Sequence, residues 1–183
     1  MYWQVSENLD DEYANMGAMP DFDYHKEDFS WIQGSKFDGQ WPGGLEYHID
    51  PDCGDLVPDM ITTGTPLVTK RFIEVLESLG IENFQTFEMT LLDKGSKKIE
   101  KEFFVFNLLD RFDCVDMENS VYKSMEGSKR LYFKKIIIDK DKAENKLIFR
   151  ANETPSEIFI DDSVKKALEE AGLFGLEFIK ASV

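Results

Sequence analysis

Two stretches of this chain carry the same order of apolar and capping residues. In the first, apolar side chains recur at helical spacing from Phe72 to Leu79, after a short apolar run and before Gly80. The second starts at Ile158–Ile160, and its apolar stripe stops before Gly172. A glycine directly after such a stripe is typical of the end of a helix. We therefore predict two similar strand-helix-strand units.

A shift of 92 residues aligns the two units without a gap, which places Leu76 on Leu168 and Gly80 on Gly172. Thr69 and Asp161 then stand where the first turn of each helix needs an N-cap. Gene duplication would explain this alignment. Any two capped strand-helix-strand units also resemble each other, so both explanations remain open.

The remainder of the chain is richer in strand patterns than in helix patterns. Strand-like runs occur at Tyr2–Val5, Leu45–Ile49, Phe84–Leu92, Phe103–Leu109, Leu131–Ile138 and Lys146–Arg150. The run Phe103–Leu109 is apolar on both faces, which is typical of a buried central strand. We predict the α+β class, with a mixed and mainly antiparallel sheet.

The first third of the chain is acidic and aromatic. Residues 1–60 contain 14 of the 36 acidic residues but only two of the 21 basic ones, Lys26 and Lys36, and they contain 10 of the 24 aromatic residues. Residues 7–44 lack clear periodicity, yet burial of so many rings stabilises an ordered arrangement. We expect residues 1–60 to form an irregular, aromatic-rich segment packed on an α+β domain of residues 61–183, in a single compact unit.

Charge and motif content exclude several function classes. A net charge of −15 repels nucleic acid and anionic membrane, and it favours basic partners. Cys53 and Cys114 have no recognisable metal-ligand spacing, which is typical of free thiols in a reducing compartment. Neither a signal peptide nor a run of about 18 apolar residues is visible. We expect a cytoplasmic protein that binds no nucleic acid and no membrane.

No catalytic or metal site can be assembled from the motifs. His25 and His48 lie in acidic surroundings without a recognisable nucleophile. The acidic run at 50–55 resembles the start of a calcium loop, but its glycine comes one position early and Ile61 occupies the place of the required Glu. We predict no catalytic residue, no metal and no cofactor.

One acidic segment directly follows the most apolar strand. Asp110, Asp113 and Asp116 recur at a spacing of three beside Arg111 and Cys114. Carboxylates grouped in this way can serve acid–base chemistry or hold a metal. They can equally cap turns and face solvent, with the thiol packed as a small apolar group.

This same segment carries a family resemblance. Asn107–Asp116, followed by Glu118 and Ser120, resembles a signature of a bacterial family of immunity proteins that accompany polymorphic and contact-dependent toxin systems. The resemblance continues at Phe149-Arg150, Pro155, Ile158–Asp161, Ala167–Leu173 and Gly175-Leu176. We expect the residues of these motifs to be structural: Asp110, Asp113, Cys114, Asp116, Ser120, Arg150, Pro155, Gly172 and Gly175.

The resemblance implies a protein that binds and neutralises a cognate toxin and that brings no catalytic residue of its own. Many such toxins act on nucleic acid and present a basic cleft, so an acidic surface with aromatic anchors is a complementary partner. The candidate contact residues are Asp10, Asp11, Glu12, Tyr13, Asp21, Asp23, Tyr24, Asp28 and Trp31. Two alternatives remain open: an enzyme that uses Asp110, Asp113 and Asp116 with His48, and a housekeeping protein-binding module without a toxin partner.

Overall fold

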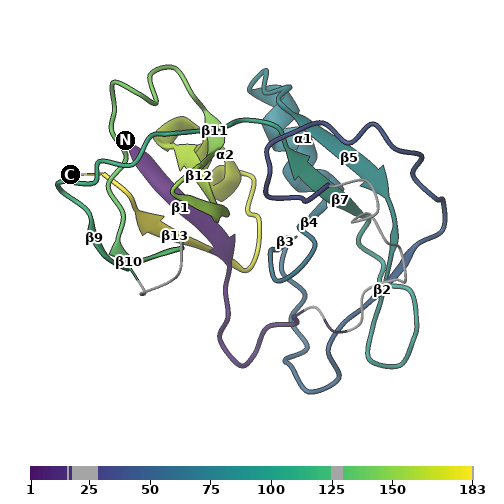
Figure 1. Ribbon diagram of the computed structural model, residues 1–183. Coiled ribbons are helices and arrows are strands. Elements are labelled where there is room, and N and C mark those ends of the chain that lie inside the picture. The colour runs from purple at the N-terminus through teal and green to yellow at the C-terminus, as the bar shows by residue number, and fades with distance from the viewer. Residues whose placement is uncertain (16, 18–28, 125–129, 183) are drawn as a thin grey trace.

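The computed structural model describes residues 1–15, 17, 29–124 and 130–182, and it is built around two neighbouring β-sheets (Figure 1). The larger sheet has five strands in the order β13 (Leu176–Lys180), β1 (Tyr2–Glu7), β12 (Thr154–Asp161), β11 (Ile148–Ala151) and β8 (Arg111–Phe112). Neighbours in this sheet are antiparallel except for β11 and β8. The first strand of the chain therefore lies inside this sheet.

A second sheet has four strands, all antiparallel to their neighbours. Their order is β3 (Met60–Ile61), β4 (Leu67–Thr69), β7 (Phe103–Leu108) and β5 (Phe84–Glu88). Two strand pairs complete the described structure: β2 (Glu46–His48) with β6 (Thr90–Leu92), and β9 (Val121–Ser124) with β10 (Leu131–Lys135). The predicted α+β class with mainly antiparallel pairing is confirmed.

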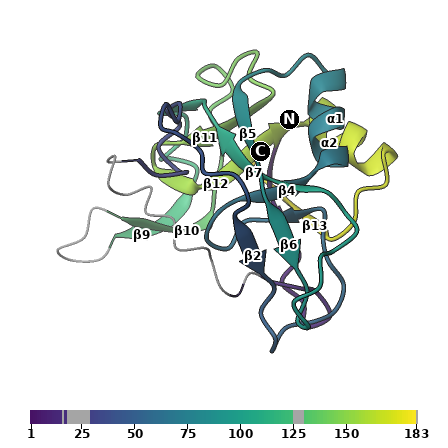
Figure 2. The ribbon, with the colours of Figure 1, turned by 90° about the vertical axis from the view of Figure 1, so that its right-hand side faces the viewer.

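The two helices, α1 (Lys70–Ser78) and α2 (Asp162–Glu170), lie against each other on one side of the molecule (Figure 2). The Asp161 carboxylate accepts hydrogen bonds from two backbone N–H groups in the first turn of α2. Thr69 occupies the same position before α1 but makes no side-chain cap. Its hydroxyl donates instead to the buried carboxylate of Asp59, at 3.1 Å.

Both helices occur within the same local arrangement of strands. Helix α1 and helix α2 are nine residues long and start 92 residues apart, and β5 and β13 are separated by the same shift. In each half, the strands before and after the helix flank a third strand that is antiparallel to both. This third strand is β7 in the first half and β1 in the second.

The main core lies between the two sheets and the helices. Phe72 and Leu76 of α1 pack there with Leu168 of α2, Phe106 of β7 and Ile160 of β12, all of them fully buried. The two halves therefore share one apolar interior and stabilise each other. Among the described residues, no helix is long and apolar enough to cross a membrane.

A second core explains how the acidic first third of the chain is held. Phe29, Trp31 and Phe37 are buried against Leu67 and Val105 of the four-stranded sheet. Residues 29–45 contain no helix or strand, so their rings and not a backbone ladder anchor them. The expected domain boundary at residue 60 falls inside β3.

A buried carboxylate joins the two sheets. Glu7, at the end of β1, accepts hydrogen bonds from the backbone N–H and the hydroxyl of both Thr62 and Thr63, which follow β3. A buried charge is costly unless it is fully hydrogen-bonded, and these four donors meet that need. The contact fixes the point from which the acidic loop after β1 departs.

Candidate functional site

The structure separates the predicted contact residues into three groups. Asp10, Asp11 and Glu12 are exposed in the loop that follows β1, and Tyr13 beside them is half-buried. Asp21, Asp23, Tyr24 and Asp28 lie outside the described residues. Trp31 is buried and packs edge-on against Phe29. Its ring is therefore part of the core and is not a contact residue.

The exposed carboxylates belong to a pair of hydrogen-bonded loops. Residues 8–15 form one loop and residues 50–56 form the other, and we call them the acidic loop pair. Leu56 N–H donates to the Glu12 carbonyl at 3.0 Å, and Ala14 N–H donates to the Leu56 carbonyl at 2.9 Å. Gly54 N–H donates to the Tyr13 carbonyl at 3.0 Å. This pairing brings Asp52 and Asp55, both exposed, next to Asp10–Glu12.

The position of Asp52 and Asp55 in this surface cannot be predicted from the sequence. The acidic run at 50–55 resembles only an incomplete calcium loop in the sequence. Its pairing with residues about 40 positions earlier depends on the tertiary fold and leaves no local pattern. The Asp55 carboxylate also forms an ion pair with Lys94 at 2.9 Å.

Two glycines at or beside the loop pair leave no room for a side chain. A Cβ on Gly54 would lie 1.9 Å from the carbonyl carbon of Glu12, so no other residue fits there without displacing a loop. Gly175 has a φ of +70°, and its Cβ would lie 2.9 Å from the Tyr13 ring. The motif residue Gly175 therefore packs closely against Tyr13 of the acidic loop pair.

Apolar side chains lie among the carboxylates. Leu9 is 67% exposed and Leu56 is 41% exposed. The Tyr13 ring rests on the exposed Phe174 ring, with 5.3 Å between the centroids. A small cavity of about 270 Å³ lies between the two loops. Exposed apolar groups surrounded by charges are typical of protein interfaces.

The three aspartates of the alternative site have separate partners. The Asp110 carboxylate forms an ion pair with Lys146 at 2.8 Å, and Asp113 accepts from the amide of Asn152 at 2.7 Å. Hydrogen bonds from the side chain and backbone of Asn119 lower the pKa of Asp116, which closes a local turn. His48, proposed to act with them, lies on β2, which belongs to a different sheet. These contacts favour structural roles.

Other motif residues are also held by structural contacts. Burial raises the pKa of the Cys114 thiol to about 12, which leaves it protonated at neutral pH and a poor nucleophile. Arg150 is buried, and burial lowers its pKa to about 10; its Nη1 donates to the carbonyls of Pro155 and Ser156. The Ser120 hydroxyl accepts from Ile137 N–H at 2.9 Å. Within the described ranges, no group of His, Cys, Asp and Glu is arranged to hold a metal ion.

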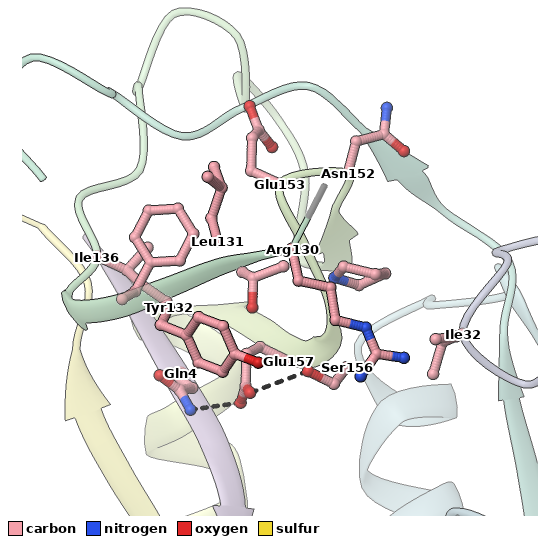
Figure 3. A pocket seen from close by; sticks show the side chains of 13 residues that line it. Gln4, Ile32, Arg130, Leu131, Tyr132, Ile136, Asn152, Glu153, Ser156 and Glu157 are labelled. Atoms are coloured by element: carbon pink, nitrogen blue, oxygen red, sulfur yellow. Dashed lines mark hydrogen bonds between the residues drawn. The ribbon is translucent and has the colours of Figure 1, made fainter. Parts of the chain in front are cut away.

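A larger cleft of about 570 Å³ lies between β10 and the first half of β12 (Figure 3). Its apolar walls include Leu131, Phe133, Ile136 and Pro155. Tyr132 also lines the cleft and is 53% exposed (Figure 3). The cleft is distinct from the acidic loop pair, and sequence analysis selected none of its residues except Pro155.

A comparison with protein families finds a match over the whole chain. The model of the Immunity protein family (Imm11) matches residues 1–183, the whole length of the chain. No curated protein gives a significant match. The resemblance stated from the motifs around Asp110–Asp116, Arg150 and Gly172 is confirmed.

Proposed function

Because this chain belongs to the Imm11 immunity protein family, we propose that it neutralises a cognate bacterial toxin by binding it. The family assignment supports an immunity function and a binding role, and the separate partners of Asp110, Asp113 and Asp116 give no support to the enzymatic alternative. We further propose that the toxin belongs to a polymorphic system and is neutralised in the cytoplasm.

The acidic loop pair is the surface that we propose for the contact. The observation that carries this proposal is the convergence of five exposed carboxylates around Leu9 and Leu56, on two loops that hydrogen bonds hold together. The five are Asp10, Asp11, Glu12, Asp52 and Asp55. Leucine side chains in this setting provide apolar contact area, and the carboxylates select a basic partner.

Occlusion of a basic active cleft is the mechanism that suits this surface. A nuclease-like toxin must attract phosphate groups, so its cleft is electropositive, and a protein with a net charge of −15 is steered toward it. Steering of this kind raises the association rate more than it slows dissociation, and it weakens as salt is added. Tyr13, supported by Phe174, would then provide an aromatic contact next to the charges.

The experiment is co-expression with the toxic C-terminal domain encoded directly upstream. We expect rescued growth and a stable complex. A triple variant, Asp10→Lys, Asp11→Lys and Glu12→Lys, should reduce the association rate at least about tenfold at low salt. The matched control is Glu74→Lys, Glu77→Lys and Glu170→Lys, which changes three exposed carboxylates on the helices by the same total charge.

The outcomes test the proposed contact surface and the proposed immunity function separately. If both triple variants slow association equally, only net charge matters and the acidic loop pair is not the contact surface. If the toxin is neutralised without a complex, binding is not the mechanism. If neither rescue nor a complex is seen, the immunity proposal for this pair fails.

A further inference from the structure

The β9–β10 hairpin has the opposite charge from the rest of the molecule. Lys123 on β9 and Lys134 and Lys135 on β10 are exposed, and Arg130 directly precedes β10. The described residues of the two strands include no Asp or Glu. A local concentration of cations on a chain with a net charge of −15 is not a general property of its surface.

The same hairpin exposes large apolar side chains. Val121 and Tyr122 on β9 and Tyr132 on β10 are all exposed. The Tyr122 ring packs on Phe133 across the hairpin, with 5.5 Å between the centroids, and Tyr122 remains 40% exposed in this contact. Tyrosines beside cations form the type of surface that is enriched in protein interfaces.

Strand β10 of the hairpin also forms one wall of the 570 Å³ cleft, and β12 forms the other wall (Figure 3). Among the described strands, β10 pairs with β9 alone, so its other edge has no strand partner. The two carboxylates in the cleft accept hydrogen bonds from neutral groups of the protein. Glu157 accepts from Gln4 Nε2 at 2.5 Å, and Glu153 accepts from the backbone N–H groups of Cys114 and Val115.

We propose that the β9–β10 hairpin and this cleft bind an acidic, extended segment of a partner protein. The partner's carboxylates would pair with Lys123 and Lys134, and an apolar or aromatic side chain would enter the cleft beside Tyr132. An edge strand accepts an extended peptide through its backbone groups, which adds affinity without a requirement for a particular sequence. In Figure 1 the hairpin lies apart from β2 and from the strands of the four-stranded sheet.

This inference is independent of the proposed toxin contact. The acidic loop pair selects a basic surface, whereas the hairpin selects an acidic one, so the two surfaces serve different partners or two regions of one partner. Nucleic acid also carries negative charge. Its charge extends along the whole strand, so a protein with a net charge of −15 repels it more strongly than it repels a short acidic peptide. We therefore favour the peptide.

The test uses a fluorescein-labelled random copolymer of glutamate and tyrosine, with binding to the full chain followed by anisotropy at low salt. We expect binding that the double variant Lys123→Glu and Lys134→Glu weakens at least about tenfold, and that Tyr132→Ser also weakens. The matched control is Lys97→Glu and Lys98→Glu, two exposed lysines in a turn outside the hairpin, which should change binding less than about twofold.

Each alternative outcome overturns the proposal. Absence of binding does so directly, and equal weakening by the control shows that only net charge is sensed. Tighter binding of a single-stranded oligonucleotide of the same length identifies the surface as a nucleic-acid site. If the charge reversal prevents folding, as judged by circular dichroism, Lys123→Gln with Lys134→Gln replaces it, and unchanged affinity in that variant also overturns the proposal.

Discussion

Cys114 shows how a single buried group ties stability to pH. Its thiol is fully buried beside the Glu153 carboxylate, and both burial and that charge disfavour the thiolate. The ordinary pKa of 9.0 rises to about 12 in the folded protein. In the unfolded chain the thiol loses its proton near its ordinary value, so between pH 9 and 12 the folded state binds more protons. Stability therefore falls as the pH rises through this range.

We predict that Cys114→Ala flattens the alkaline loss of stability. At pH 10.5 the thiol should account for a decrease of about 1–2 kcal/mol in the free energy of unfolding relative to pH 8, and this part is absent from the variant. Urea titrations at the two pH values measure the difference. Cys53→Ala is the control, because Cys53 is only half-buried. Equal pH dependence in wild type and Cys114→Ala would contradict the prediction.

At the scale of elements, the acidic loop pair depends on one position without a side chain. Gly54 places its backbone against that of Glu12, where even a methyl group would overlap the carbonyl. We predict that Gly54→Ala separates the loops, costs about 1–3 kcal/mol of stability and weakens toxin binding by an order of magnitude or more. Chemical denaturation and the toxin-binding assay measure the two effects.

Gly43 provides a control for this prediction. A Cβ on Gly43 would have no heavy atom within 4 Å, and the φ of this residue lies outside the left-handed region. Gly43→Ala should therefore leave both stability and affinity unchanged within error. If Gly54→Ala behaves like Gly43→Ala, the close approach of the two loops does not shape the surface.

The elements that local pattern could predict are those whose boundaries depend on local chemistry. Both helices end before a glycine with positive φ, Gly80 or Gly172, and both have a regular apolar stripe. The strand expected over Phe84–Leu92 is interrupted at Met89, where β5 leaves the four-stranded sheet and β6 joins β2. Such a change of partner is a tertiary event and has no signature in a single strand.

The candidate site was predictable only in part for the same reason. The exposed run Asp10–Glu12 was identified from composition, whereas its neighbours Asp52 and Asp55 depend on the pairing of two remote loops. The aromatic and acidic residues around Trp31 predict a surface anchor, but its ring is buried because burial of a large apolar ring stabilises the core. Alternation in an irregular segment does not indicate which side chains face inward.

At the scale of the whole molecule, β1 lies at the start of the chain but belongs to the sheet formed mainly by the C-terminal half. It occupies in that half the place that β7 occupies in the first, between the strands before and after the helix. Its start lies beside the end of β13, with Trp3 opposite Lys180 and Ala181 N–H donating to the Tyr2 carbonyl at 3.0 Å. The two described ends of the chain, at Met1 and Ser182, accordingly lie close together (Figure 1).

We predict from this topology that the chain tolerates circular permutation. A short glycine-containing linker from residue 183 to Met1 would turn β13 and β1 into a hairpin, and new ends opened between Leu9 and Asp10 lie in an exposed loop. The permutant should unfold cooperatively, with a free energy within about 1–3 kcal/mol of wild type. By contrast, deletion of residues 1–7 removes an internal strand together with Glu7, and it should prevent folding.

A second permutant with the same linker, opened at the exposed turn around Gly95, shows whether the linker itself is tolerated. If that control folds and the permutant opened at Leu9 does not, β1 must precede the first half in the chain, and the view of two equivalent halves that exchange only the position of one strand is wrong.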